Sequence, residues 1–271
     1  MKLLLEQCLQ SVLLASKNIS TEIFVVDNAS ADGSEAYFNN KFDGVKFRWS
    51  KENLGFSKAN NSVLPETKGD YILFLNPDTI VPEDCFEKCM HFLHAHPECG
   101  GLGVKMMNAK GVYLKESKRG IPGPMASFAK MSGLIRVFPQ SKIFAAYYAG
   151  HLSENETHEI EVLSGAFMMV SRKALEKVKG FDEDYFMYAE DIDLSLRIRA
   201  SGFKNYYLPS TSIIHLKGES TPKHTAFYTR HFYGAMKIFV RKYYAKQPVV
   251  KSVMLFAISC SKLLADIKRK C

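Results

Sequence analysis

Asn76-Pro77-Asp78 is the first group of residues whose types and spacing could do chemistry. It follows directly on the apolar run 71–75. An aspartate at the exit of a buried strand can bind a divalent cation through oxygen, and the cation can in turn hold a diphosphate. Because Pro-Asp is also common in turns, a purely structural turn is the alternative interpretation.

Glu190, Asp191 and Asp193 form the second group, three carboxylates within one turn at the start of a predicted helix. The helix dipole favours acids there, so simple capping is one interpretation. The other is a general base, a carboxylate that accepts a proton from a hydroxyl group as that group attacks. His215 ends a strand-like run, where it could ligate a metal, contact a diphosphate or lie on the surface.

Several well-known catalytic and nucleotide-binding motifs are absent from the sequence. It contains no Gly-x-x-x-x-Gly-Lys-Ser/Thr loop, no Gly-x-Gly-x-x-Gly turn, no Gly-x-Ser-x-Gly elbow and no His-Glu-x-x-His. Phosphate-loop ATPases, dinucleotide dehydrogenases, α/β hydrolases and zinc proteases of that type are therefore not expected. The six cysteines lack zinc-finger spacing and predict free thiols in a reducing cytoplasm.

The elements that must position these groups alternate between strands and helices. Apolar runs predict strands at 22–27, 45–49, 71–75, 101–107, 160–170 and 206–215. Helices are predicted at 2–16, 32–40, 57–64, 82–94, from 171 onward, and at 190–200. This alternation predicts an α/β fold with a largely parallel sheet, whose ligands bind at the C-terminal ends of the strands. Segment 116–159 breaks the pattern and is interpreted as a substrate-covering segment or a surface excursion.

The last fifth of the chain is strongly basic. The 271 residues carry a net charge of +8, with +10 between Lys223 and Cys271 and −2 in the remainder. Two helices are predicted here, at 222–245 and 248–269. The uncharged run 252–261 is too short to span a bilayer, but the aromatic and basic residues before it fit a helix pair lying on an anionic membrane. Packing on the body or a dimer interface is the alternative, and no nucleic-acid partner is expected because no recognition motif is visible.

Six short motifs follow one another along the chain. In order they are Val25-Val26-Asp27-Asn28-Ala29-Ser30, Asn53-Leu54-Gly55-Phe56 with Ala59-Asn60, Leu75-Asn76-Pro77-Asp78, Ser164-Gly165-Ala166-Phe167-Met168, Gly180-Phe181-Asp182-Glu183 and Ala189-Glu190-Asp191-Ile192-Asp193. Together they resemble the family 2 glycosyltransferases of the GT-A fold, and most of all bacterial rhamnosyltransferase-like members. The resemblance extends to about Tyr244. It implies a GT-A α/β catalytic domain over residues 1–221, with a central mostly parallel sheet, and a helical extension over 222–271.

The resemblance also implies roles for the residues that match the nucleotide-sugar pocket. Asp27 would contact the nucleotide base and ribose, with Asn28 and Ser30 beside it. Gly165 would lie where the backbone approaches the donor sugar or the acceptor. The loop that lines the pocket would consist of Asn53, Gly55, Phe56 and Asn60.

For the reaction itself, the resemblance implies a metal site and a base. Asn76 and Asp78 match the two acidic positions of an Asp-x-Asp motif, so Asp78 would bind Mg²⁺ or Mn²⁺ while the neutral amide of Asn76 binds a cation less strongly. His215 would approach the metal or the diphosphate. Asp191 would be the catalytic base, with Glu190 as its neighbour.

The reaction implied by this resemblance is a single inverting displacement. A sugar would move from a nucleoside-diphosphate sugar, with dTDP-rhamnose as the first choice, to a glycan or polyprenyl-diphosphate-linked acceptor of a bacterial surface polysaccharide. The protein would lie in the cytoplasm, peripheral on the inner face of the plasma membrane. A nucleotidyltransferase is the rival from the same fold class, but the Gly-rich loop with Arg and Lys that it should show is not visible.

The chain departs from the family pattern at its start. It begins at the helix that normally follows a first apolar strand, so one strand of the sheet is expected to be missing. A missing central strand would leave a sheet edge unpaired. Two explanations are a start codon placed inside a longer gene and a truncated, inactive relative that binds a nucleotide or a partner without catalysis.

Overall fold

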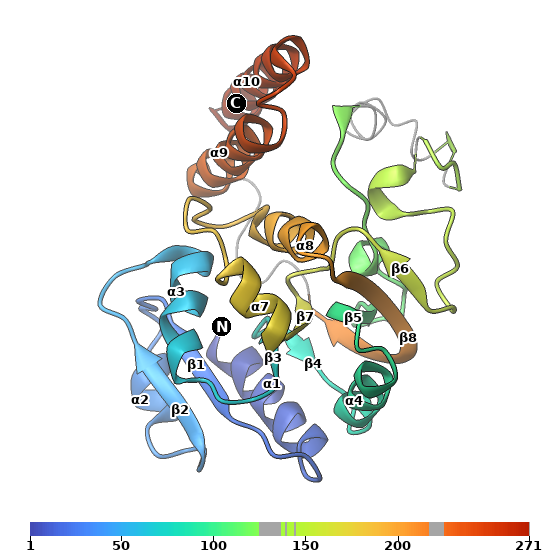
Figure 1. Ribbon diagram of the computed structural model, residues 1–271. Helices are drawn as coiled ribbons and strands as arrows, with labels where there is room; N and C mark the ends of the chain where they lie inside the picture. The colour runs from blue at the N-terminus through green and yellow to red at the C-terminus, as the bar shows by residue number, and fades with distance from the viewer. Residues whose placement is uncertain (125–136, 139, 144, 217–224, 271) are drawn as a thin grey trace.

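The computed structural model describes residues 1–124, 137–138, 140–143, 145–216 and 225–270 (Figure 1). Its strands are β1 (Ile23–Asp27), β2 (Val45–Trp49), β3 (Tyr71–Leu75), β4 (Thr79–Ile80), β5 (Cys99–Met107), β6 (His158–Ile160), β7 (Phe167–Ser171) and β8 (Lys204–His215). Its helices are α1 (Lys2–Ala15), α2 (Ser34–Phe38), α3 (Gly55–Val63), α4 (Cys85–Ala95), α7 (Arg172–Val178), α8 (Glu190–Ala200), α9 (Ala226–Tyr243) and α10 (Pro248–Lys270). The α/β class predicted from the alternating runs is confirmed.

The strands form two sheets in the described part of the chain. β1 and β2 make a parallel pair, and the other strands follow the order β3-β7-β5-β8-β4, with β6 also on β8. In this larger sheet the β5–β8 pair is parallel and the four other neighbouring pairs are antiparallel. The prediction of a mostly parallel sheet is therefore wrong. Antiparallel neighbours need no crossover that returns the chain to the same end of the sheet, so β5 and β7 can run in opposite directions.

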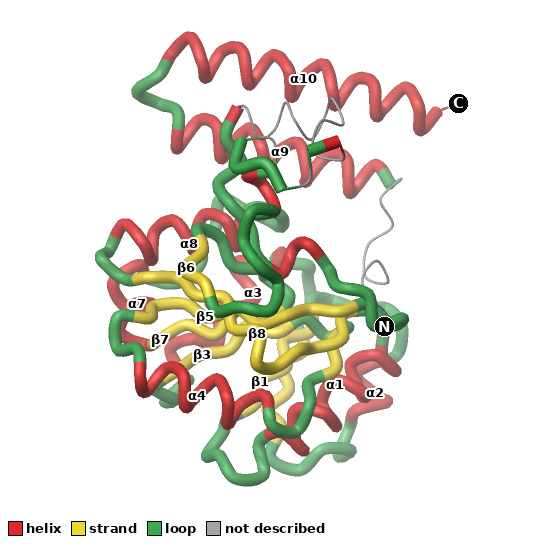
Figure 2. The backbone as a smooth tube through the Cα atoms, turned by 90° about the vertical axis from the view of Figure 1, so that its right-hand side faces the viewer, coloured by secondary structure: helices red, strands yellow, loops and turns green. Residues whose placement is uncertain are grey.

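Helices cover both faces of the larger sheet, with α1 and α4 on one face and α7 and α8 on the other (Figure 2). On the first face, Cys85, Cys89 and Leu93 recur at four-residue spacing along α4 and pack on strand residues such as Leu102. On the second face, side chains of α7 and α8, among them Leu194, pack on β3 and β7. The sheet is thus held between two apolar layers.

β1 and β3 each have one edge that no other strand pairs with among the described residues. Every residue of β1 is only half-buried, although four of the five are apolar. Just before these two strands begin, the backbone N–H of Lys68 donates a hydrogen bond to the carboxylate of Glu22, at 2.7 Å. The two sheets therefore meet through side chains and not through a continuous backbone ladder.

The two C-terminal helices differ in how they contact the rest of the molecule. α9 packs on the side of the fold that carries α8, where Ala235 and Phe239 share a buried cluster with Tyr185 and Ile192. α10 folds back against α9 and projects from the body (Figure 1). The helix pair predicted for this part of the chain is confirmed for the residues that the structure describes.

Candidate active site

Asp191 lies in the first turn of α8 and faces a buried arginine that none of the six motifs contains. Its Oδ2 atom forms an ion pair with Arg119 and accepts a hydrogen bond from the backbone N–H of Gly165, at 3.1 Å. Its Oδ1 atom accepts from the N–H of Ile192, at 2.8 Å. One carboxylate oxygen is therefore held from two sides, whereas the other keeps a free lone pair.

Arg119 connects α8 to the turn before β7. The exposed fraction of its side chain is 10%, and it also donates a hydrogen bond to the backbone carbonyl of Leu163. Burial alone would lower the pKa of Arg119, but the attraction of Asp191 and Tyr147 outweighs burial and the pKa is raised. The guanidinium thus stays charged beside Asp191. In the sequence its only signal is a basic pair with Lys118, which does not distinguish a buried arginine from an exposed one.

The turn that carries Gly165 interrupts the strand predicted over 160–170. β6 ends at Ile160 and β7 begins at Phe167, so a single strand over that range is wrong. Backbone N–H groups between them serve α8 instead of a strand partner, since Leu163 donates to Ser195 Oγ at 3.0 Å and Gly165 donates to Asp191. A Cβ on Gly165 would lie 3.4 Å from Oδ2 of Asp191. The missing side chain at this position leaves the carboxylate accessible.

Glu190 is buried directly beside Asp191. Its Oε2 atom has no hydrogen-bond partner among the described residues. Burial, and then the charge of Asp191, raise the pKa of Glu190 to about 8. Glu190 is therefore neutral at pH 7. The two residues before it, Tyr188 and Ala189, have φ angles of 70° and 63°, a strained left-handed conformation that sets the direction in which α8 begins.

Asp78 and His215 meet where β4 pairs with β8. Asp78 is 2% exposed, and its Oδ1 atom lies 3.3 Å from Nε2 of His215. Neither this Oδ1 nor Nδ1 of His215 has a hydrogen-bond partner in the described ranges. Buried polar atoms are normally satisfied, so this pair is suited to a further ligand.

This pair could bind a cation, because a carboxylate and an imidazole are both metal ligands. Across the described residues, no group of three His, Cys, Asp or Glu side chains could hold a metal ion by itself. Asn76 lies close to the pair in sequence, and its backbone N–H donates to the carbonyl of Ala166 at 3.1 Å. The turn that follows β3 therefore lies next to the turn that carries Gly165, and the structure brings Asp78 and Asp191 to the same region.

The predicted nucleotide loops also come together. The side chain of Asn28 donates from Nδ2 to the carbonyl of Gly55 and accepts at Oδ1 from the N–H of Leu54, both at 2.9 Å. Gly55 has φ of 78°, and a Cβ there would lie 2.4 Å from the carbonyl oxygen of Phe186. That oxygen accepts the N–H of Phe56 at 2.6 Å. The loop before α8 is thus attached to the loop that begins α3.

The other predicted nucleotide contacts make local hydrogen bonds. Oδ2 of Asp27 accepts the N–H of Ser30 at 2.9 Å, and Oδ1 of Asn53 accepts the N–H of Gly55 at 3.0 Å. Nδ2 of Asn60 donates to the carbonyl of Phe56 at 2.9 Å, within α3. No hydrogen bond joins Asp27 or Ser30 to the region of Asp78 and Asp191 within the ranges that the structure describes.

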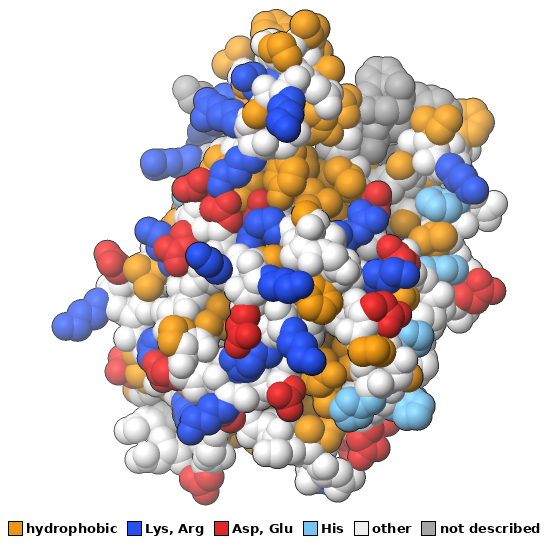
Figure 3. Space-filling model, viewed as in Figure 1, with side chains coloured by type: hydrophobic (Ala, Val, Ile, Leu, Met, Phe, Trp, Pro, Cys, Tyr) orange, Lys and Arg blue, Asp and Glu red, His pale blue; other side chains and the backbone are white. Residues whose placement is uncertain are grey.

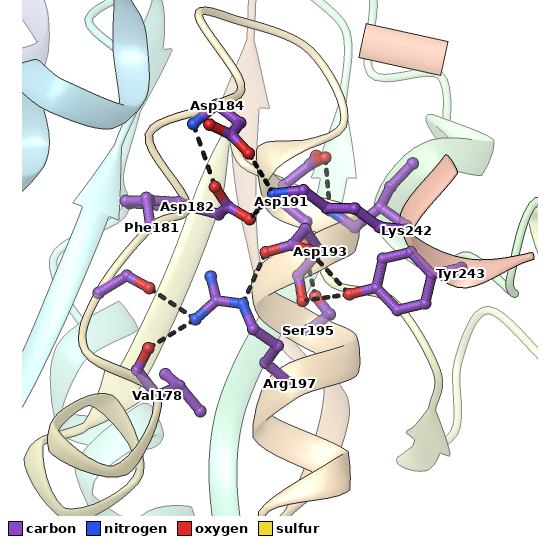
Figure 4. Close-up of polar contacts among 12 residues, drawn as sticks. Val178, Phe181, Asp182, Asp184, Asp191, Asp193, Ser195, Arg197, Lys242 and Tyr243 are labelled. Atoms are coloured by element: carbon purple, nitrogen blue, oxygen red, sulfur yellow. Dashed lines mark hydrogen bonds and ion pairs between the residues drawn. The ribbon is translucent and has the colours of Figure 1, made fainter. Parts of the chain in front are cut away.

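Asp193 has a structural role on the side of α8 that faces α9 (Figure 4). Its carboxylate accepts from Nε of Arg197 at 2.6 Å and from the hydroxyl of Tyr243 at 2.8 Å. Lys242, the residue before Tyr243, forms an ion pair with Asp182. These contacts fix the first turn of α8, and with it Asp191, between the body and α9.

Comparisons with known proteins indicate the family of the chain. The family model described as glycosyl transferase family 2 matches residues 2–179. The chain is 29% identical over 244 residues to the N-acetylglucosaminyl-diphospho-decaprenol L-rhamnosyltransferase of Mycobacterium tuberculosis, covering 84% of this chain and 78% of that protein. It is 28% identical over 181 residues to the rhamnosyltransferase WbbL of Escherichia coli K12, covering 59% of this chain and 60% of that protein.

Two solved structures show the fold. The mannosyltransferase PcManGT from Pyrobaculum calidifontis, in complex with GDP-Man and Mn²⁺, matches with a TM-score of 0.57 at 16% identity, over 99% of this chain and 72% of its own. TarS 1–349 of S. aureus, in complex with UDP-GlcNAc, matches with a TM-score of 0.58 at 19% identity, over 93% of this chain and 66% of its own. At these identities the likeness concerns the fold alone, and it confirms the GT-A fold.

Proposed function

The chain belongs to glycosyl transferase family 2 and is a glycosyltransferase; from that premise we propose that it transfers a sugar, with inversion, from a nucleoside-diphosphate sugar to a lipid-linked acceptor in bacterial surface polysaccharide synthesis. The observation that carries the proposal is the carboxylate of Asp191, held by Arg119 and Gly165 in the same region as the Asp78 turn. We propose dTDP-rhamnose as the donor because two relatives are named as rhamnosyltransferases. A polyprenyl-diphosphate-linked acceptor is proposed on the decaprenol substrate in one of those names.

Asp191 is the proposed general base. Its Oδ2 is held by Arg119 and Gly165, so its Oδ1 is the atom that accepts the proton of the acceptor hydroxyl. The acceptor oxygen then bonds to the anomeric carbon, while the bond from that carbon to the diphosphate oxygen breaks. The nucleoside diphosphate leaves with the bonding electron pair. A single displacement of this kind inverts the configuration at the anomeric carbon.

Asp78 and His215 are the residues proposed to hold a divalent cation, Mg²⁺ or Mn²⁺. Mg²⁺ is usually bound by one or two carboxylates together with substrate phosphates, so two protein ligands suffice when a diphosphate supplies the others. Bound there, the cation would offset negative charge on the leaving diphosphate. The amide of Asn76 would contribute less because it carries no charge.

The loops after β1 and before α3 are the proposed nucleotide site. Asn28 connects them through two hydrogen bonds, so they form one unit that faces the nucleotide. Asp27 is proposed to contact the base and ribose. The remaining proposed contacts are Ser30, Asn53, Gly55, Phe56 and Asn60. We further propose that residues 1–221 form the catalytic unit, that 222–271 form its extension, and that the protein works in the cytoplasm at the inner face of the plasma membrane.

An inactive relative is the second candidate function. The half-buried β1 and the edges of β1 and β3 favour it, because in the described part of the chain these edges leave backbone N–H and C=O groups without a strand partner. Such a protein would bind a nucleotide or a partner without transferring a sugar. The two candidates differ in turnover.

Thermal-shift binding of the 271-residue chain to dTDP, UDP and GDP, each with and without Mn²⁺, tests the donor site. A bound nucleotide raises the melting temperature by mass action. We expect a metal-dependent rise with one nucleotide, which Asp78→Ala abolishes and Asp191→Asn retains. Sugar transfer to a polyprenyl-linked acceptor should be lost in Asp191→Asn. Nucleotide binding without turnover by the wild type would favour the inactive relative, and no shift with any nucleotide would contradict the donor site.

A further inference from the structure

The outward face of α10 carries a continuous apolar stripe. Its side chains recur every three or four residues and so lie on one face of the helix. The largest of them are strongly exposed, with Phe256 at 71% and Leu263 at 62%. The stripe consists of Val249, Val253, Phe256, Cys260, Leu263, Leu264 and Ile267. A patch of this kind on a folded protein marks an interaction surface.

The opposite face of α10 is already occupied. Ile258 is buried against the neighbouring helix, and Lys262 forms an ion pair with Asp266 at 2.6 Å on this half-buried side. α9 is in turn fixed to the catalytic helix by the hydrogen bond from Tyr243 to Asp193 and by its buried apolar residues. The stripe is therefore presented outward by a helix pair attached to the body. In Figure 3, hydrophobic side chains gather at the end of the molecule that α10 forms, with Lys and Arg beside them.

Charge decides which occupant fits the stripe. The segment from Lys223 to Cys271 carries +10, and its one acid is Asp266. A second copy packed stripe to stripe would bring two such segments together, and like charges at short range repel. An anionic lipid surface carries the complementary charge and also accepts apolar side chains at its boundary. We propose that α10 docks on an anionic lipid membrane through this stripe.

The docked helix lies on the membrane and does not cross it. By length and composition alone, Pro248–Arg269 could span a bilayer, and it is the one helix in the described part of the chain that could. Spanning would place Lys251 and the Lys262–Asp266 pair in hydrocarbon and would strip α9 from the face that it covers. Charges in the membrane interior are costly, whereas a helix with one apolar face is stable at the interface.

Docking would also orient the active site. The beginning of α9 packs on the segment before the catalytic helix, where the ring of His231 stacks on Phe186 at 4.3 Å and Tyr228 lies 5.4 Å from Tyr188. The membrane-facing helix pair is thus continuous with the loop that leads to Asp191. That this places the site near a lipid-linked acceptor rests on the proposed function, but the docking itself does not.

Vesicle flotation of the full chain tests the proposal. Wild type should float with vesicles of phosphatidylcholine plus phosphatidylglycerol, and float less with phosphatidylcholine alone or at high salt. Phe256→Glu with Leu263→Glu should weaken binding by about tenfold or more, because charge replaces apolar surface on the stripe. The matched control is Gln7→Glu with Gln10→Glu, which makes the same number of charge changes at exposed polar positions of α1, away from the stripe, and should retain most of the binding.

Three results would overturn the docking. The first is that the wild type does not float with anionic vesicles, and the second is that the two double variants float equally. The third is that the wild type binds no vesicles but forms a dimer in sedimentation velocity, and that the stripe variant is a monomer. An unchanged melting temperature shows that the stripe variant is folded. The nucleotide-induced thermal shift separates the two proposals, since a shift without flotation contradicts the docking alone and flotation without a shift contradicts the donor site alone.

Discussion

Glu190→Gln is expected to remove a pH dependence of stability that the native side chain causes. The carboxyl is 8% exposed, and its pKa is raised to about 8, first by burial and then by the charge of Asp191. In the unfolded chain the ordinary pKa of 4.5 applies. Between these two values the folded state keeps a proton that the unfolded state has lost. The free energy of unfolding therefore falls as pH rises from 4.5 to 8.

The size of this loss follows from the two pKa values. They differ by about 3.5 pH units, and each unit corresponds to about 1.4 kcal/mol. The upper limit is thus about 5 kcal/mol, and local relaxation lowers the expected loss to about 2–3 kcal/mol. Glutamine has nearly the same shape and cannot ionise. The variant should match the wild type near pH 5 and be more stable at pH 8.5 and above.

Urea unfolding followed by far-UV circular dichroism, at pH values from about 5 to 9, measures this difference. Glu83→Gln is the control, because that carboxyl is exposed and its replacement should leave the pH dependence unchanged. The Glu190→Gln variant also separates the roles of Glu190 and Asp191 in catalysis. If Glu190 is neutral at pH 7, Glu190→Gln keeps most of the transfer rate there while Asp191→Asn does not. A Glu190→Gln variant that loses as much stability as the wild type between pH 5 and 8.5 would refute this account of Glu190.

Three further changes test other parts of the site. Arg119→Met should lower kcat and destabilise the fold by about 3 kcal/mol, because it leaves Asp191 without its countercharge. Transfer assays measure kcat and urea unfolding measures the stability. Arg119→Lys should restore part of the rate. Gly55→Ala should lower the free energy of unfolding by about 1–3 kcal/mol and weaken nucleotide binding, because its Cβ would meet the carbonyl of Phe186. Gly111→Ala is the control for backbone strain alone, since Gly111 has φ of 73° and open space around it. The thermal-shift assay compares the two variants. Tyr243→Phe should lower the free energy of unfolding by about 1–2 kcal/mol through loss of the bond to Asp193, and an unchanged melting temperature would contradict the anchoring of α9.

Most strands could be predicted because their signals are local. Tyr71–Leu75 is an uninterrupted apolar run closed by Asn-Pro-Asp, and it forms β3 with the predicted bounds. The run 160–170 looked the same but is not one strand, since Val162 and Leu163 are buried in a turn that packs under α8. Burial alone makes both segments apolar, and the sequence does not say whether backbone or side chains satisfy the N–H groups. β4, with two residues, is too short to leave a periodic signal.

The site residues were predictable only where each lies beside a strand or helix that the sequence itself indicates. Asp191 and Asp78 could be singled out because each follows or begins a recognisable element. Arg119 could not, because its role comes from a contact across 72 positions with Asp191. The attachment of Phe186 to the loop at Gly55 is of the same kind, since it joins two backbones that are far apart in sequence. Tertiary packing decides such contacts, and local spacing carries no trace of them.

The three carboxylates of the first turn of α8 show why their order alone could not assign a base. The N-cap residue, Ala189, makes no side-chain cap, and among the three carboxylates Asp191 accepts a backbone N–H of the first turn, that of Ile192. Glu190 is neutral through burial, and Asp193 is 2% exposed and bound by Arg197 and Tyr243. Asp191 keeps 15% of its side chain exposed and one oxygen with a free lone pair. It is thus the one carboxylate of the turn that is both paired with a buried arginine and open to a reacting hydroxyl.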